Sequence, residues 1–371
     1  MDFSFTGDQQ LLKNSAHAFL DEHCKSALVR SLMDDPRGES ETMWKEMAQL
    51  GWLGLALPES VGGTGLGMVE TAILLEEMGR AACPTPYWPT VLAALAIEHA
   101  GSAEQKSRWL PSIANGGARG SVAFLERELD WDPASIATRA DTKGAGATLR
   151  GLKQFVPWAT VADVLVVPAR SADGLAFYLV DPGARGVTVA SLTAIDLGTR
   201  WATVHLDGAA AVPLGRPAEA SALHDALFRR AAVGAAAEML GAARRCLDMA
   251  VGYAKVREQF GQPIGAFQAI RHKCAEMLVE VENAHAATYY AAWALDAGAE
   301  DAGLAASVAK AYVGDASRKV CGEAIQVHGG IGFTWEYDLH LYMKRAKALE
   351  PLFGDAEYHR ELIVRQVTAS A

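Results

Sequence analysis

The chain has 371 residues, of which 50% are hydrophobic and 21% are charged, so it can bury several cores and divide into two or three domains. Its 34 basic and 44 acidic residues give a net charge of -10, which excludes the basic field that attracts nucleic acid or an anionic membrane surface. The first residues lack the basic and apolar regions of a secretory signal, and no apolar run reaches the roughly 18 residues of a membrane span. We therefore expect a soluble, cytoplasmic protein.

The cysteines give no sign of a metal site or a disulfide framework. There are five, an odd number, and they are widely scattered without any paired CxxC unit. Because this residue type favours protein interiors, we predict buried apolar side chains at Cys24, Cys83, Cys246, Cys274 and Cys321.

Residues 1–117 are predicted to form an N-terminal α-helical domain. Apolar residues recur at helical spacing in 9–22, 43–53 and 69–78. The glycine-rich segment 57–67 lies between the last two runs. Its spacing matches neither a dinucleotide-binding fingerprint nor a P-loop, so we interpret it as a turn that joins two helices.

Residues 118–217 are predicted to form a middle β domain of two packed sheets. The periodicity changes there to short β-like runs, separated by turn residues such as Ser171-Ala-Asp-Gly174. The runs are 161–169, 175–180, 187–190 and 201–206.

Residues 218–371 are predicted to form an antiparallel four-helix bundle. The apolar residues from Val233 to Ala254 lie on one face of a long helix, and those from Phe267 to Val281 mark the next. Two further helices are expected over about 300–327 and 336–366. The predicted fold class is therefore mainly α with a central β domain.

Two blocks of the last domain carry the most specific pattern: Arg257-Glu-Gln-Phe-Gly-Gln-Pro-Ile264 and Gln326-Val-His-Gly-Gly-Ile-Gly332. With the helix-loop segment 44–63 and the order of the three domains, they make the whole chain resemble the acyl-CoA dehydrogenase family. The resemblance implies an FAD enzyme that removes two hydrogens from an acyl-CoA thioester. In that family a carboxylate takes the α proton, while the flavin accepts the β hydrogen as hydride.

The resemblance also implies how FAD is held. The guanidinium of Arg257 would pair with the pyrophosphate, since arginine is a fixed-charge fork suited to phosphate oxygens. FAD would lie at a subunit interface, so the chain is expected to be an oligomer. The alternative is that neither block binds a cofactor. Arg257 and Glu258 would then be a solvent-exposed helix end, and Gly329-Gly330 an ordinary helix stop. The implied cofactor-binding residues are Arg257, Gln259, Phe260, Gln326, Gly329 and Gly330.

Departures from the family pattern concentrate where the chemistry takes place. The Thr-Glu-Pro-Gly-Ala-Gly-Ser-Asp-like loop, which holds the flavin and the thioester in the family, corresponds here to residues 125–132, without its hydroxyls and glycines. The Trp-Ile-Thr-like segment that packs on the flavin corresponds to Phe155-Val-Pro157, where proline replaces the threonine donor.

The catalytic carboxylate is missing from both of its usual family positions. One corresponds to Phe353 and the other to Ala231, and neither side chain can accept a proton. Glu238, Asp355 and Glu350 are the nearest carboxylates. We interpret each of them as a surface or ion-paired residue rather than a relocated base.

Three hypotheses follow from this combination. The first is a base-lacking partner subunit of a heteromeric acyl-CoA dehydrogenase, of the kind known for CoA thioesters of steroid side chains, with a separate flavoprotein as electron acceptor. The second is a self-sufficient homo-oligomer whose base has moved to Glu238 or Asp355. The third is a non-catalytic structural member that binds neither FAD nor CoA.

Two further polar features receive structural interpretations. Asp338, His340 and Tyr342 follow the second block, and we expect an ion-pair cluster at a helix N-terminus rather than a metal or acid-base site. His328, inside the second block, is expected to pack or to lie beside the cofactor rather than to act as a base.

Overall fold

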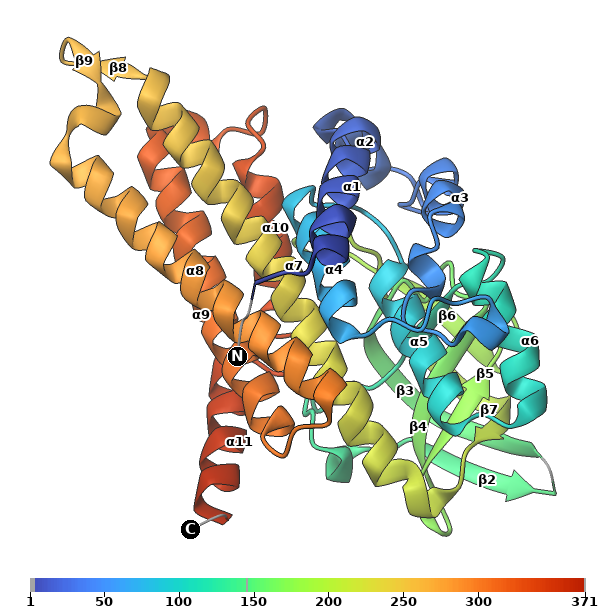
Figure 1. Ribbon diagram of the computed structural model, residues 1–371. Coiled ribbons are helices and arrows are strands. Elements are labelled where there is room, and N and C mark those ends of the chain that lie inside the picture. The colour runs from blue at the N-terminus through green and yellow to red at the C-terminus, as the bar shows by residue number, and fades with distance from the viewer. Residues whose placement is uncertain (1–3, 145, 370–371) are drawn as a thin grey trace. The chain divides into compact units, whose positions relative to one another are not determined.

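The computed structural model describes residues 4–144 and 146–369, which divide into two compact units (Figure 1). The first unit contains the described residues up to 31, residues 68–83 and the chain from 229 onward. The second contains residues 32–67 and 84–228. Helical N-terminal and C-terminal parts with a β region between them confirm the predicted fold class, and the domain boundaries at 117 and 217 stay a prediction.

The first unit is helical. Its helices α7, α8 and α9 run side by side (Figure 1), and α9 also packs against α10 and α11. The elements are α1 (Gly7–His23), α2 (Ser26–Met33, in this unit to residue 31), α4 (Met68–Arg80), α7 (Ala220–Val256, in this unit from 229), α8 (Gln268–Ala297), α9 (Ala302–His328), α10 (Leu339–Leu349) and α11 (Ala356–Ala369).

The fourth bundle helix differs from its prediction. Instead of one helix over 336–366, the chain forms α10 and α11, with a break at residues 350–355. Pro351 has no backbone N–H to donate, and Phe353 and Gly354 follow with φ of 59° and 88°. Two consecutive left-handed residues cannot continue a right-handed helix, so the helix ends here.

Side-chain caps begin helices α1 and α4 of this unit. Thr6 accepts a hydrogen bond from the backbone N–H of Gln9, and the Gln9 side chain accepts one from the backbone N–H of Thr6, which completes a capping box. At α4, Asp296 of α8 takes the role of the cap. Its carboxylate accepts from the N–H groups of Met68 and Val69 at 2.7 and 2.9 Å.

Helices α4 and α7 cross with their backbones in contact. A Cβ added at Gly79 would lie 2.0 Å from the carbonyl oxygen of Glu238, and one added at Gly241 would lie 1.9 Å from that of Glu76. Only a residue without a side chain allows such an approach. These two glycines therefore set the distance between the helices.

A buried carboxylate lies next to this crossing. Glu76 is 1% exposed and accepts from Lys13 of α1 at 3.1 Å, Arg244 of α7 at 3.0 Å and the Tyr289 hydroxyl of α8 at 2.6 Å. Burial acts to raise the pKa of Glu76, but the Lys13 and Arg244 charges outweigh it and the pKa is lowered. One ionised side chain thus ties four helices together.

The second unit combines helices with a β region. Its helices are α3 (Glu41–Gln49), α5 (Tyr87–Ala100) and α6 (Ala103–Ala114), together with the short turns η1 (Trp52–Gly54), η2 (Glu59–Val61), η3 (Pro133–Ser135) and η4 (Pro217–Glu219). Its strands are β1 (Gly120–Val122), β2 (Arg139–Lys143), β3 (Gly146–Pro157), β4 (Val164–Ser171), β5 (Gly174–Val180), β6 (Val187–Leu192) and β7 (Trp201–Leu214).

These strands form one seven-stranded sheet, so the expectation of two packed sheets is wrong. The order is β1-β4-β2-β3-β7-β5, and an additional β4–β5 pairing closes the path on itself. The reason is the length of β7, whose 14 residues pair with β3, β5 and β6. The enclosed core contains Leu149, Leu165, Val204 and Tyr178.

The structure also shows how far the cysteines are buried and whether a helix could span a membrane. Four of the cysteines are buried as predicted, and Cys274 is half-buried. Within residues 4–144 and 146–369, every helix is too short or too polar to cross a membrane.

We expect Gly241→Ala to lower the free energy of unfolding by about 1–3 kcal/mol or more, because its methyl group would meet the α4 backbone. Gly252→Ala on the same helix is the matched control, since an added Cβ there meets nothing within 4 Å. It should leave stability unchanged or raise it by up to about 1 kcal/mol. Chemical denaturation of both variants tests the crossing, and equal stabilities would contradict it.

Candidate functional site

The first sequence block forms an exposed hairpin at the end of α7. The strands β8 (Glu258–Gln259) and β9 (Gln262–Pro263) pair across Phe260 and Gly261, which have φ of 53° and 78°. Positive φ at both central residues is the pattern of a tight hairpin turn whose twist matches its strands. Phe260 is consequently 92% exposed.

Arg257 enters this hairpin with an exposed side chain. Its backbone N–H donates to Tyr253 and its carbonyl accepts from Ile264, so its backbone position is fixed from both sides. Its exposed guanidinium forms no ion pair or hydrogen bond with the described part of the chain. The Gln259 side chain donates to the carbonyl of Glu258, so it lies along the hairpin surface. A fixed backbone with free donors suits an anionic ligand.

The second block forms the end of α9 and the turn η6 (Gly329–Phe333). Gly329 ends the helix with φ of 63°, a conformation that favours glycine. Gly330 has no positive φ, and a Cβ there would meet nothing within 4 Å. The fold of this chain therefore does not require glycine at 330, and the open space beside the exposed Gln326 suits a ligand that approaches the backbone.

His328 joins the two blocks. Its ring stacks on Tyr253 at 4.4 Å, and Tyr253 is the residue that accepts the N–H of Arg257. Nδ1 donates to the carbonyl of Ala324 at 2.7 Å, so Nε2 accepts from the Tyr337 hydroxyl at 3.0 Å. Burial lowers the pKa of His328. The residue is a neutral packing group, as predicted.

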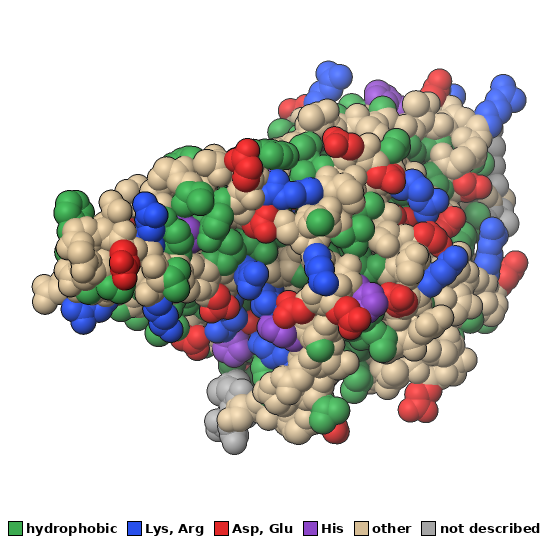
Figure 2. All heavy atoms as spheres, turned by 90° about the horizontal axis from the view of Figure 1, so that it is seen from above, with side chains coloured by type: hydrophobic (Ala, Val, Ile, Leu, Met, Phe, Trp, Pro, Cys, Tyr) green, Lys and Arg blue, Asp and Glu red, His purple; other side chains and the backbone are tan. Residues whose placement is uncertain are grey.

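Apolar side chains surround these blocks on the surface. Figure 2 shows several of them beside basic side chains at the left end of that view, where Figure 1 places the hairpin. Exposed apolar groups of this size are typical of an interaction surface. The members with more than 40% exposure are Val256, Phe260, Ile331, Phe333 and Trp335.

The family's usual base position lies in the break between α10 and α11. Phe353 is 4% exposed, and its carbonyl accepts from His359 Nε2 at 2.8 Å. Lys310, fully buried, donates to the carbonyls of Glu350 and Gly354 at 2.7 and 2.6 Å. Burial lowers the pKa of Lys310 to about 7. This loop is held at three carbonyls, yet it presents no carboxylate at 353.

The other candidate carboxylates are engaged elsewhere. Glu238 lies 3.5 Å from the buried guanidinium of Arg345. Asp355 accepts from the backbone N–H of Tyr358 and thus caps the first turn of α11. Glu350 pairs with Lys347 and Arg318. The second usual base position, Ala231, is fully buried.

In the second unit, the segment that replaces the family's flavin loop is anchored by a buried ion pair. Glu126 accepts from Lys153 Nζ at 2.6 Å and from the N–H groups of Ala137 and Thr138. Lys153 is fully buried and also donates to Pro168. Burial lowers the pKa of Lys153 to about 8. The pair was not predicted from the sequence, although Lys153 lies among apolar residues and was a signal for it.

The Phe155-Val-Pro157 segment forms a bulge in β3. The register with β7 shifts between Lys153 and Val156, and Phe155 has φ of 48°. Bulges redirect a side chain, and Phe155 is 39% exposed as a result. Pro157 accepts from Ser121 through its carbonyl and has no donor of its own.

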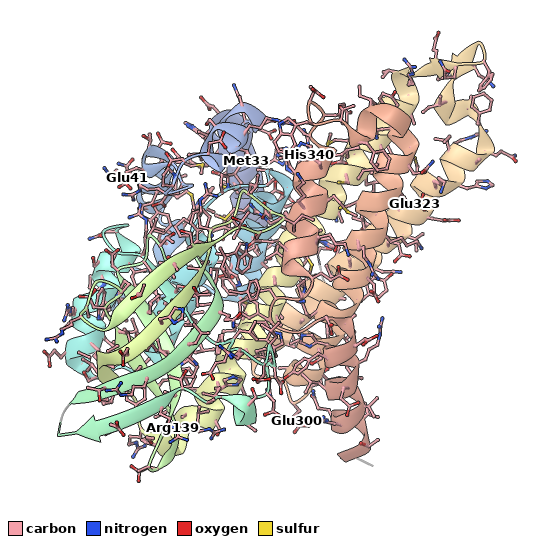
Figure 3. The ribbon with its side chains drawn as sticks, turned by 180° about the vertical axis from the view of Figure 1, so that it is seen from behind. Met33, Glu41, Arg139, Glu300, Glu323 and His340 are labelled. Atoms are coloured by element: carbon pink, nitrogen blue, oxygen red, sulfur yellow. The ribbon has the colours of Figure 1, made fainter. Side chains whose placement is uncertain are left out.

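Among the polar residues after the glycine turn, Asp338 forms an ion pair at the start of a helix, and its cation comes from α2 rather than from the predicted residues His340 and Tyr342. Asp338 precedes α10 and accepts from Ser26 at 2.6 Å and from Arg30 at 2.7 Å. His340, labelled in Figure 3, stacks on Trp335 at 4.5 Å. Figure 3 also labels Glu323 on α9, which pairs with Lys273 of α8. No group of three metal-ligating side chains occurs in residues 4–144 and 146–369.

We expect Lys153→Met to destabilise the chain by about 3–5 kcal/mol, because it leaves the Glu126 carboxylate beside the core without its cation. The double variant with Glu126→Gln should recover part of this loss. Arg150→Met, which removes the exposed pair with Asp207, is the matched control and should cost at most about 1 kcal/mol. Urea unfolding measures all three, and similar losses at both sites would contradict the burial argument.

The second prediction concerns pH. Burial, followed by the Lys310 charge, lowers the pKa of His359 from 6.5 to about 4. Between these values the unfolded chain binds a proton that the folded chain does not, so stability falls as the pH drops through this window, by up to about 3 kcal/mol. His359→Gln should flatten this dependence, and His205→Gln, on an exposed strand position, should not. Denaturation between pH 7 and 4 measures the slopes.

Two family models match the chain, "Acyl-CoA dehydrogenase, N-terminal domain" at residues 6–117 and "Acyl-CoA dehydrogenase, C-terminal domain" at residues 223–368. A curated relative, "Acyl-CoA dehydrogenase IpdE2" from Mycolicibacterium smegmatis, is 32% identical over 350 residues, which are 94% of each chain.

Two solved structures are similar over nearly the full length. One is a variant of the "Tcur3481-Tcur3483 steroid ACAD", with a TM-score of 0.91, 33% identity and 98% of both chains covered. The other is the ChsE4-ChsE5 complex from Mycobacterium tuberculosis, with a TM-score of 0.91, 29% identity and 99% of both chains covered.

Proposed function

Because the chain belongs to the acyl-CoA dehydrogenase family, we propose that it is the base-lacking subunit of a heteromeric FAD-dependent enzyme and that it holds FAD for a partner subunit. The partner supplies the carboxylate that removes the α proton of the acyl-CoA thioester. A separate flavoprotein accepts the electrons.

One observation carries this proposal: the loop at 350–355 is held in place by hydrogen bonds, but its base position, 353, has a phenyl ring instead of a carboxylate. Three of its carbonyls are bound by Lys310 and His359, and the side chain at 353 is a buried phenyl ring. A general base needs a group that can accept a proton within reach of the substrate. Phe353 and Ala231 offer none.

The surface formed by the hairpin and the glycine turn, in contrast, has features that support FAD binding. The pyrophosphate matches the exposed guanidinium of Arg257, and the open backbone at Gly330 beside Gln326 suits the adenosine half. Gln259 and the exposed Phe260 would line the cofactor at the hairpin, and Gly329 sets the turn. FAD, when bound, supplies the hydride acceptor for the reaction. This chain's own residues bind and orient it.

The exposed apolar groups around the hairpin support an assembly. Five large side chains around residues 256–260 and 331–335 are exposed, and a partner that covers them would also cover Arg257. FAD held at such a surface lies between subunits.

The two similar solved structures support a heteromer rather than a homo-oligomer. Each names a pair of different chains, and one names a steroid enzyme. We therefore extend the proposal to the substrate class, the CoA thioester of a bulky acid such as a steroid side chain.

The relocated-base alternative gains no support from the geometry. Glu238 is committed to the buried Arg345, and Asp355 holds the first turn of α11.

We predict that the chain purified alone contains far less than one FAD, and that co-purification with its partner yields a stoichiometric flavin complex. Arg257→Met should then weaken FAD retention about tenfold or more, because a charge-assisted bond to phosphate is lost. Absorbance of the purified complexes in the flavin bands measures the content.

Lys255→Met is the matched control for this measurement. Lys255 is an exposed cation in the last turn of α7, two residues before Arg257. It should leave the flavin content unchanged if the Arg257 effect is specific. Full flavin content and turnover in the chain alone would overturn the proposed function.

A further inference from the structure

We propose that a cavity in the first unit binds a phosphate-type oxyanion. The cavity has a volume of about 190 Å³, and residues of α1, α2, α4, α7 and α10 line it. None of the residues that we assign to FAD lines it. The inference therefore stands independently of the proposed function.

The lining is rich in ionised side chains. Lys25, Arg80 and Arg245 contribute three cations, and Asp21 and Asp338 contribute two carboxylates. Five charges around so small a space would be costly if they were unmatched. The net charge of the lining side chains therefore decides whether the cavity suits a cationic or an anionic ligand.

Both carboxylates already have their cations. Asp21 accepts from Arg80 at 2.5 Å, and Asp338 accepts from Arg30 at 2.7 Å. Arg80 in turn also donates to the buried Glu77 at 2.9 Å. Among the lining cations, Lys25 and Arg245 are therefore left without a carboxylate partner in the part of the chain that the structure describes, and they are the surplus positive charge of the cavity.

The surplus cations have donors to spare. In the described part of the chain, Lys25 has no ion pair or side-chain hydrogen bond, and Arg245 has a hydrogen bond to Tyr342 only. A guanidinium carries five N–H donors and an ammonium three, so most of them are unused. Asp21 and Asp248 act on Arg245 only through space.

A helix N-terminus also favours an anionic ligand in this cavity. α2 begins at Ser26 on the cavity wall, and the N-terminus of a helix favours negative charge. Together with the two surplus cations, it selects a ligand with several acceptor oxygens and a full negative charge. A phosphate group is the ligand class that uses such donors best.

The size of the cavity limits the ligand. Pockets for whole nucleotides or drug-sized molecules usually exceed about 300 Å³. A cavity of about 190 Å³ holds a single phosphate group, either free or at the end of a molecule that projects outward.

Inorganic phosphate and glycerol phosphate are the probes. We would titrate each into the intact chain, against chloride at matched ionic strength, by thermal unfolding and by calorimetry. Phosphate should raise Tm beyond the chloride response. Tighter binding of glycerol phosphate would assign the site to a phosphate ester, and equal or tighter binding of the inorganic ion would assign it to free phosphate.

Lys25→Gln and Arg245→Gln should each weaken phosphate binding about tenfold. Lys25 is exposed and has no partner among the residues that the structure describes, so its variant should fold normally even if loss of Arg245 lowers stability. Arg185→Gln removes one charge from an exposed turn of the second unit and should have no effect. A phosphate response no larger than that of chloride, or one that persists in both cavity variants, would overturn the proposal.

Discussion

The contact between the backbones of α4 and α7 is the constraint on which the first unit depends. Gly79 and Gly241 bring the two helices together, and this approach places the Glu76 carboxylate where cations from α1 and α7 and a hydroxyl from α8 can reach it. A buried carboxylate is tolerated only with such partners. The glycines and the buried carboxylate therefore depend on each other. At a wider helix separation the partners of Glu76 would not reach its carboxylate.

That arrangement sets the direction of α7, and α7 carries the site. Its last turn presents Tyr253, whose ring stacks on His328 at the end of α9 and whose carbonyl accepts the N–H of Arg257. The hairpin and the glycine turn are consequently brought to the same end of the bundle by packed aromatic rings. The exposed guanidinium of Arg257 then lies on a rigid support, which limits the entropy lost when a ligand binds.

At the family's base position the backbone is held firmly, but the side chain cannot accept a proton. Lys310 and His359 bind three carbonyls of the loop at 350–355, so its backbone shape is strongly determined. The left-handed conformation of Phe353 costs free energy that the surrounding hydrogen bonds offset. A loop of this shape with a phenyl ring in place of a carboxylate is consistent with a subunit that keeps the architecture of a catalytic site while another chain carries out the proton transfer.

The sequence by itself determined the helical character of both ends of the chain, four of the seven strands between them and the absence of a carboxylate at positions 231 and 353, because helical periodicity, turn residues and residue identity are local properties. It also indicated an ion pair at Asp338 and the packing role of His328. Only the tertiary structure decided the single closed sheet, the break before α11, the pair of Glu126 with Lys153 and the surplus charge at Lys25 and Arg245. Each of these depends on which distant segments meet. Burial and charge balance are set by partners far apart in the chain, and no local pattern of residues specifies them.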